Sequence, residues 1–93
     1  MRFEWDADKA ARNQQRHGIS FPEAATAFGD PLSLTVDDPD HSVDERRFIL
    51  IGQTHAGRLI VVAHTARGDD DENIRIVSAR LPTGREQRAY ETG

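Results

Sequence analysis

Two apolar segments joined by a short connection constrain the fold more than any other feature of the sequence. The segments RFILIG (residues 47–52) and LIVVAHT (residues 59–65) are almost continuously apolar, which is typical of strands with little contact with water. The connection QTHAG (residues 53–57) is too short for a crossover between parallel strands. The two segments are therefore predicted to form an antiparallel hairpin, and the fold is built on a β-sheet.

Three further segments have the pattern of strands. Residues 32–36 alternate leucine or valine with polar or small residues, as a half-buried strand does. The segment IRIVSA (residues 74–79) follows the polar turn ARGDDDEN, and RFEW (residues 2–5) alternates aromatic with charged residues. An acidic loop, DDPDHSVDE (residues 37–45), precedes the central hairpin. These segments predict a sheet of four to five strands.

A first helix is predicted between Asp6, which is a suitable N-cap, and His17, with Gly18 as its left-handed terminator. Lys9, Asn13 and His17 are spaced four residues apart, so they form a polar stripe along one side of this helix. The last turn of a helix also favours a cation. His17 therefore has a structural explanation as well as a functional one.

Capping boxes mark two more helices. Ser20 and Glu23 precede an apolar pattern of helical period, and Thr83 and Glu86 precede a last helix. The predicted element order is β-α-α-β-β-β-β-α. We expect one α+β domain over residues 1–93, with an antiparallel sheet, two N-terminal helices and one C-terminal helix.

The charge distribution leaves nucleic acid open as a ligand, although the net charge of −4 argues mildly against it. Residues 1–45 contain 4 Lys or Arg and 10 Asp or Glu, whereas residues 46–93 contain 8 and 6. Fields from exposed charges fade within about 10 Å at ordinary salt. One cationic face of an acidic protein can therefore still attract phosphates.

Several classes of site are excluded or weakened. Cysteine is absent, the histidines at positions 17, 41, 55 and 64 lack the spacing of metal ligands, and DDDE (residues 69–72) has the pattern of a solvated turn. No Walker-type glycine loop, GxSxG elbow or RNP aromatic pair occurs. The longest apolar run is too short to cross a bilayer, and the first ten residues lack the apolar region of a signal peptide. We expect a cytoplasmic protein without metal, cofactor or membrane contact.

Arginines near the ends of predicted strands are the main candidates for chemistry. Arg47, Arg67, Arg75 and Arg80 lie on or just beyond strands, alongside His64. Each arginine alone can be a rim residue paired with a carboxylate, and His64 can be a hydrogen-bonded core residue. Four guanidinium groups around one small sheet nevertheless repel each other unless an anion lies between them. A phosphodiester would match their planar forks.

Strand parity limits this hypothesis. Arg75 and Arg80 are separated by an odd number of residues, so on a regular strand their side chains point to opposite faces. They share a face only if the strand bends near Ser78. Arg67 has the parity of Thr65, opposite to that of its neighbouring histidine. Parity alone does not identify the functional face.

Several strings resemble the BrnT family of bacterial type II toxins. They are WDADKAARNQQRHGISF, FGDPLSL, HSVDERRFILIG, VVAHTARGD and IRIVSAR…GREQRAYE, and they cover nearly the whole chain in order. The resemblance implies a RelE-like ribonuclease fold. It also implies a cognate antitoxin (BrnA-like, of ribbon-helix-helix type) that forms a hetero-oligomer with the toxin and through which alone operator DNA is bound.

The resemblance also suggests functional positions, which are Lys9, His17, Glu45, Arg47, His64, Arg67, Arg75 and Arg80. Arg46 is not among them, because the family usually has an acidic residue there. Two departures from the family pattern make two surfaces of this chain less suited to binding RNA. The last helix contains fewer cations than usual, and the DDDEN turn is longer and more acidic.

Together, the residues and the resemblance suggest a metal-independent ribonuclease toxin that inhibits translation and growth until its antitoxin neutralises it. The ribose 2′-OH would attack the adjacent phosphate and leave 2′,3′-cyclic phosphate and 5′-OH ends. Arg47, Arg67 and Arg80 are expected to stabilise the phosphorane. The other positions would transfer protons (His17, His64 and Glu45) or hold flanking phosphates (Lys9 and Arg75). The alternative is a non-catalytic module whose arginine face binds an acidic protein or nucleic acid.

Overall fold

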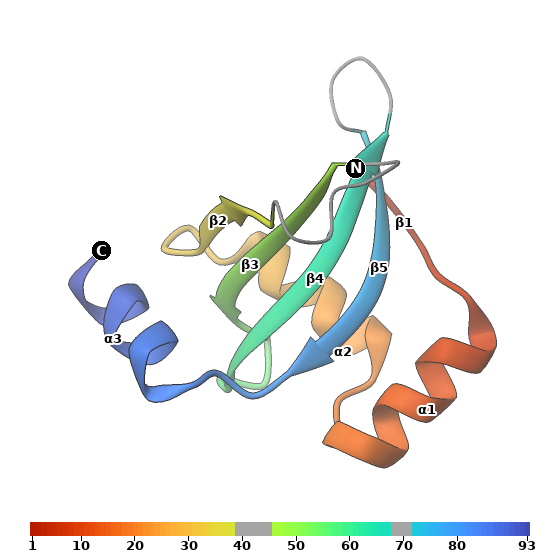
Figure 1. The fold of residues 1–93 in the computed structure, drawn as a ribbon, viewed down its shortest axis with the longest axis horizontal. Coiled ribbons are helices and arrows are strands. Elements are labelled where there is room, and N and C mark those ends of the chain that lie inside the picture. The colour runs from red at the N-terminus through yellow and green to blue at the C-terminus, as the bar shows by residue number, and fades with distance from the viewer. Residues whose placement is uncertain (39–45, 68–71) are drawn as a thin grey trace.

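The computed structural model describes residues 1–38, 46–67 and 72–93. These residues form a five-stranded sheet with strand order β1-β5-β4-β3-β2, with α-helices behind it and at its sides (Figure 1). The elements are β1 (Arg2–Glu4), α1 (Ala7–His17), α2 (Phe21–Thr26), the 3-10 helix η1 (Ala27–Gly29), β2 (Leu34–Asp37), β3 (Arg47–Gln53), β4 (Leu59–Arg67), β5 (Asn73–Arg80) and α3 (Gly84–Thr92). None of the helices in the described ranges is long and apolar enough to span a membrane. The predicted α+β class and element order are confirmed.

The sheet is mixed, whereas the sequence predicted an antiparallel one. β3 pairs with β2 and β4, and β4 pairs with β5, all in antiparallel register. β1 instead runs parallel to β5, with Phe3 opposite Ile74. The prediction was wrong at this edge because the two strands come from distant parts of the chain. No short turn fixes their relative direction.

β2 is a mostly exposed edge strand. Leu34 is half-buried, but Val36 is 53% exposed, and Leu32 lies in the turn before the strand and is 69% exposed. An edge strand has a neighbour on one side only, so alternation along it buries less than the same pattern in a central strand. The half-buried strand predicted over residues 32–36 is therefore shorter and more exposed than expected.

The main core lies between the sheet and α2, which runs behind the strands in Figure 1. Ser20 caps α2 by accepting a hydrogen bond from the Glu23 N–H at 3.2 Å. The helix then buries Phe21 and Ala24 completely, as the apolar period predicted. The buried cluster consists of Ile19, Phe21, Ala24, Ala27, Leu50, Ile60, Val62, Ile74, Ile76 and Ala79. We call the side of the sheet opposite α2 the open face.

A β-bulge in β5 determines which face of the sheet its arginines occupy. Ala63 pairs with Ser78, but the next residue of β4 pairs with Ile76, so Val77 is the extra residue. A bulge shifts the alternation of side chains by one position. Arg75 and Arg80 therefore both lie on the open face, and the condition set from the sequence, a bend near Ser78, is met.

Asn13 fixes α1 against the edge of β5. β1 pairs with β5 only as far as Arg75, which leaves the later part of this edge without a neighbouring strand. The Asn13 side chain fills the gap: its amide donates to the Ala79 carbonyl at 2.9 Å and to the Ile19 carbonyl at 3.0 Å, and its oxygen accepts from the Ala79 N–H at 3.0 Å. Asn13 is 7% exposed. The polar stripe of α1 therefore faces the sheet.

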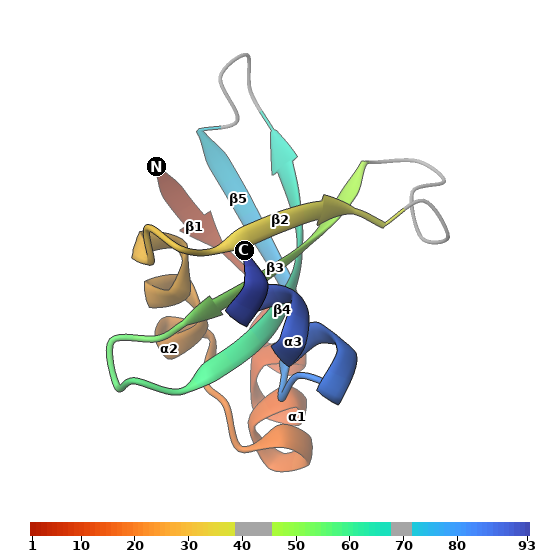
Figure 2. The ribbon, with the colours of Figure 1, turned by 90° about the vertical axis from the view of Figure 1, so that its left-hand side faces the viewer.

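The C-terminal helix α3 is attached mainly by polar contacts. Thr83 and Glu86 form the predicted capping box, and α3 buries no residue completely. The Tyr90 hydroxyl donates to Asp30 at 2.7 Å, and Arg80 binds Glu86. Figure 2 shows α3 in front of β3 and β4, so this helix borders the open face.

Candidate functional site

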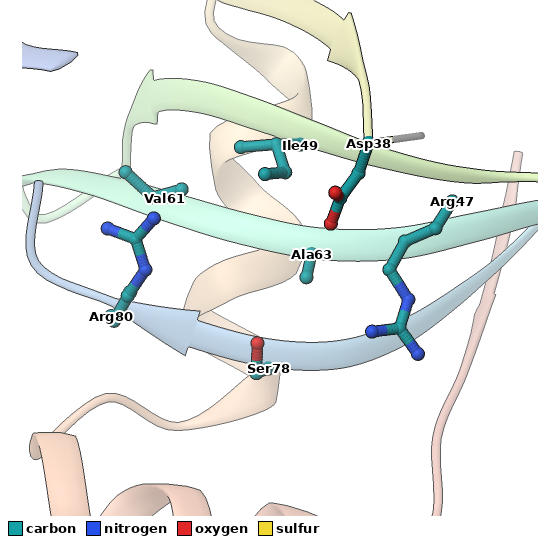
Figure 3. Close-up of a pocket in the computed structure, with 7 residues that line it drawn as sticks. All are labelled: Asp38, Arg47, Ile49, Val61, Ala63, Ser78 and Arg80. Carbon is teal, nitrogen blue, oxygen red and sulfur yellow. The ribbon is translucent and has the colours of Figure 1, made fainter. Parts of the chain in front are cut away.

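A hollow on the open face brings together two of the predicted arginines. It has a volume of about 240 Å³ and is lined by Asp38, Arg47, Ile49, Val61, Ala63, Ser78 and Arg80. Figure 3 shows Arg47 and Arg80 at opposite ends of the hollow, with the Asp38 carboxylate directed between them. We call this hollow the arginine pocket. Asp38 and Ser78 were not predicted as site residues, because one lies in a generally acidic segment and the other beside a bulge that sequence patterns do not mark.

Glu86 is the counter-ion of Arg80. The Arg80 guanidinium donates to both Glu86 carboxylate oxygens, at 2.8 and 2.9 Å. The same carboxylate accepts from the Thr83 N–H at 2.9 Å. The hydrogen bonds from Arg80 lower the pKa of Glu86 to about 2, against an ordinary value of 4.5, and this pairing raises the pKa of Arg80. Arg80 is therefore fixed in place but partly neutralised by α3.

A second hollow adjoins the arginine pocket at Ser78. Its volume is about 380 Å³, and we call it the α1 hollow because most of its lining comes from that helix: Lys9, Arg12, Asn13, Arg16, His17, Val77 and Ser78. The structure therefore brings the predicted residues Lys9 and His17 beside the arginine pocket. Arg12 and Arg16 were missed, although their spacing of four residues next to the predicted stripe was a usable signal.

The remaining predicted residues line neither hollow or lie wholly or partly outside the described residues. Arg75 lies on the open face, with its guanidinium 4.0 Å from the Glu4 carboxylate. Arg67 ends β4 with the same parity as Thr65, but its side chain is outside the described part of the structure. Glu45 is outside the described residues, as are His41 and most of the DDDE segment. Among the residues that are described, no three His, Asp or Glu side chains gather as metal ligands would.

His64 lies on the helix-covered side, away from the arginine pocket. It is 4% exposed, its ring is 4.8 Å from that of Phe28 and 5.7 Å from that of Phe48, and Nδ1 is 3.3 Å from the Val62 carbonyl oxygen. Burial lowers the pKa of this histidine, which favours the neutral ring. The structure thus matches the second interpretation of His64, a hydrogen-bonded core residue, and does not bring it together with Arg47 and Arg80.

A separate ion pair joins the β3–β4 hairpin to the two N-terminal helices. Arg58 donates to both Glu23 carboxylate oxygens at 2.8 and 2.7 Å, and to the Gly18 carbonyl at 2.8 Å. The Thr54 hydroxyl donates to Glu23 at 3.0 Å. The bonds from Arg58 lower the pKa of Glu23. We call this group the hairpin network; it joins α1, α2 and the hairpin.

Comparison with known proteins gives one family and one fold. The model of the family described as ribonuclease toxin, BrnT, of type II toxin–antitoxin system matches residues 5–86. No curated protein sequence matches the chain. The 1.1 Å crystal structure of the Brucella abortus ribonuclease toxin BrnT superposes with a TM-score of 0.67 at 20% sequence identity, covering 89% of this chain and 97% of that chain.

Proposed function

Because the chain belongs to the BrnT family of ribonuclease toxins of type II toxin–antitoxin systems, we propose that it cleaves RNA at the arginine pocket without a metal ion. The ribose 2′-OH attacks the adjacent phosphorus, and the bond to the 5′ oxygen of the next nucleotide breaks. The products are a 2′,3′-cyclic phosphate and a 5′-OH. DNA has no 2′-OH and is not cleaved.

One observation carries this proposal: Ser78 lines both the arginine pocket and the α1 hollow, so the two hollows adjoin, and we call them together the basic depression. Arg47 and Arg80 come from different strands, and Lys9 and His17 come from a helix. RNA binding needs cations along a path, because successive phosphates must be held while one of them reacts. The two adjoining hollows supply such a path.

Arg47 and Arg80 stabilise the phosphorane in this proposal. Attack of the 2′ oxygen adds negative charge to the equatorial oxygens of phosphorus, and guanidinium groups fixed before the reaction need no reorganisation to bind it. Glu86 holds Arg80 in place in the free protein. A dianionic phosphorane competes better for Arg80 than the monoanionic substrate does, so this pairing favours the transition state over the ground state.

Proton transfer is assigned to Asp38 and His17. The Asp38 carboxylate is within the arginine pocket and accepts the proton of the 2′-OH, whereas His17 in the α1 hollow supplies a proton to the departing 5′ oxygen. His64 is left out because its ring is on the other side of the sheet. Glu45 and Arg67 remain candidates by resemblance to the family.

The family implies an antitoxin as protein partner. We propose that this partner is a ribbon-helix-helix protein of the BrnA type, that it forms a hetero-oligomer with the toxin, and that operator DNA is bound through it. The expected compartment is the cytoplasm, where RNA and antitoxin are both present. The basic depression suits an acidic segment of the partner as well as it suits RNA.

The second candidate, a non-catalytic binding module, is favoured by one observation. Arg80 is already in a bidentate pair with Glu86, as a purely structural arginine would be. In this case the basic depression binds an acidic partner but no bond is cleaved.

Purified protein, a short RNA and its all-deoxy analogue in EDTA separate the two functions. We expect cleavage of the RNA alone, with 2′,3′-cyclic phosphate and 5′-OH ends detected by mass spectrometry. His17→Gln and Asp38→Asn should each lower the single-turnover rate of cleavage about 100-fold or more while RNA binding is retained, since each removes one proton-transfer group. Binding of RNA without cleavage, at high protein concentration, would favour the module.

A further inference from the structure

The hydroxyl of Thr65 is a buried polar group of the open face. Thr65 is 4% exposed, and its Oγ1 atom is buried without a hydrogen bond to any residue that the structure describes. A hydroxyl that leaves water without gaining a partner destabilises the folded state, and valine would have the same shape without this cost. A ligand that accepts a hydrogen bond from this hydroxyl would account for such a group.

Strand register places Thr65 directly between two arginines. Arg47 of β3 and Arg75 of β5 are its cross-strand partners on either side. Neighbouring strands lie about 4.8 Å apart, so all three side chains leave the sheet within one short row. The β5 bulge brings Arg80 onto the same face as this row.

The row lies beside the arginine pocket. Thr65 is two residues along β4 from Ala63, which lines the pocket, and this corresponds to about 7 Å along the strand. Arg47 belongs to both, since it lines the pocket and is a register partner of Thr65. Among the described residues, Arg75 forms an ion pair with Glu4, whose carboxylate is 4.0 Å away and whose side chain is 49% exposed, so an incoming anion can replace it.

We propose that Thr65, Arg47 and Arg75 form a second phosphate subsite, which binds the phosphate next to the one that is cleaved. The Thr65 hydroxyl donates to a non-bridging oxygen, while the two guanidinium groups bind the charge from either side. Reorientation of the two long arginine side chains around the anion exposes the hydroxyl. This inference rests on the proposed function, because the anion is a backbone phosphate of the same RNA.

Paired measurements of stability and binding test the subsite. Thr65→Val removes only the hydroxyl, so it should leave the melting temperature equal or higher while it weakens binding of a non-cleavable 2′-O-methyl RNA about ten-fold. Thr65→Ser keeps a hydroxyl and should recover most of the lost affinity. Thr35→Val, at an exposed position on the edge strand β2, is the matched control and should change neither quantity.

Salt dependence separates the hydroxyl from the charges. Arg75→Ala should reduce the slope of log Kd against log salt by about one, whereas Thr65→Val should leave the slope unchanged, because a hydroxyl displaces no counterion. Wild-type affinity in Thr65→Val, or a fall in its melting temperature that accompanies the lost affinity, would overturn the subsite.

The outcomes also separate this inference from the proposed function. Wild-type protein that binds the 2′-O-methyl RNA but cleaves no RNA would contradict the ribonuclease and leave the subsite standing. Wild-type protein that cleaves RNA, with a Thr65→Val variant of equal affinity, would remove the subsite and leave the ribonuclease. Wild-type protein that binds no RNA would overturn both.

Discussion

The hairpin network and the open face both place arginines beside carboxylates and threonines, but they satisfy their polar groups to different extents. In the hairpin network, Glu23 accepts bonds from Arg58 and Thr54, and Arg58 also binds the Gly18 carbonyl. On the open face, the equally buried Thr65 has no hydrogen-bond partner among the described residues, and the Arg75 ion pair is long.

This difference separates stability from binding. A polar group that is fully bonded within the chain binds a ligand only by exchanging a partner, as Arg80 would exchange Glu86, so its first contribution is to hold elements together. A buried polar group that lacks partners, or a cation whose ion pair is long and exposed to solvent, gains free energy when an anion arrives. By this criterion we assign a structural role to the hairpin network and propose the open face as the binding surface, although the two have similar residue types.

The largest expected effect concerns Arg47. Arg47→Ala should lower the single-turnover rate of RNA cleavage about 100- to 1,000-fold, because it removes a fixed donor to the phosphorane. Urea unfolding should change far less. Arg46→Ala is the control, since this neighbouring side chain is 73% exposed and points away to Asp37. Equal rates for the two variants would place the chemistry elsewhere.

Arg58 should show the opposite behaviour. Arg58→Ala should lower the free energy of unfolding by about 1–2 kcal/mol, a value reduced for the 41% exposure of this side chain, because it leaves Glu23 without its main partner. The cleavage rate per folded molecule should be unchanged. Arg58→Lys keeps the charge but not the fork and should lose about half as much. A specific loss of cleavage would show that the two regions are not independent.

Glu86 is expected to affect both stability and RNA binding, and its effect on stability depends on pH. Its pKa of about 2 in the folded protein lies below the ordinary value of 4.5, so its stabilising effect is complete above pH 4.5 and disappears as the pH falls towards 2. Wild-type protein should lose about 1–2 kcal/mol more than Glu86→Gln over this interval, with allowance for the partial exposure of Arg80. Parallel acid unfolding curves would contradict this.

Glu86→Gln should also bind RNA more tightly at neutral pH. The substitution removes a negative charge beside Arg80, and the phosphate no longer competes with a carboxylate for this guanidinium. Filter binding of the 2′-O-methyl RNA measures this effect. A weaker affinity would mean that Glu86 orients Arg80 for binding rather than competing with the phosphate.

The smallest expected effect compares two buried threonines. Thr54 is 5% exposed and its hydroxyl donates to Glu23. Thr54→Val should therefore cost about 1 kcal/mol of unfolding free energy, since it removes that bond. Thr65→Val should cost nothing, because no bond is removed. A similar loss in both variants would mean that hydrogen-bond satisfaction does not distinguish these two regions.

Local signals in the sequence predicted much of the fold. The apolar runs and short connection of the β3–β4 hairpin, the cap at Asp6 with Gly18, and the capping box of Thr83 with Glu86 all depend on residues close in the chain. The parallel direction of β1 was not predictable in this way, because it depends on contacts between distant segments.

The candidate site was predicted less completely than the fold. Arg47, Arg80, Lys9 and His17 were predicted as site residues, and the structure places all four around the two adjoining hollows. Asp38, Glu86 and Thr65 were missed, because what distinguishes them is a neighbour that is far away in the sequence or, for Thr65, the lack of one. His64, in contrast, was predicted as a site residue because it lies near the arginines in the sequence, but this position does not indicate which face of the sheet its side chain occupies.

The sequence by itself determined which elements form and where most of them begin and end, because capping and periodicity act over a few residues. Only the tertiary structure decided which cations share a face. One extra residue, Val77, moves Arg80 onto the side of Arg75, and one buried amide, Asn13, directs the stripe of α1 towards them. Side-chain alternation has a period of two residues, so a single bulge reverses every later position, and no local pattern reports it.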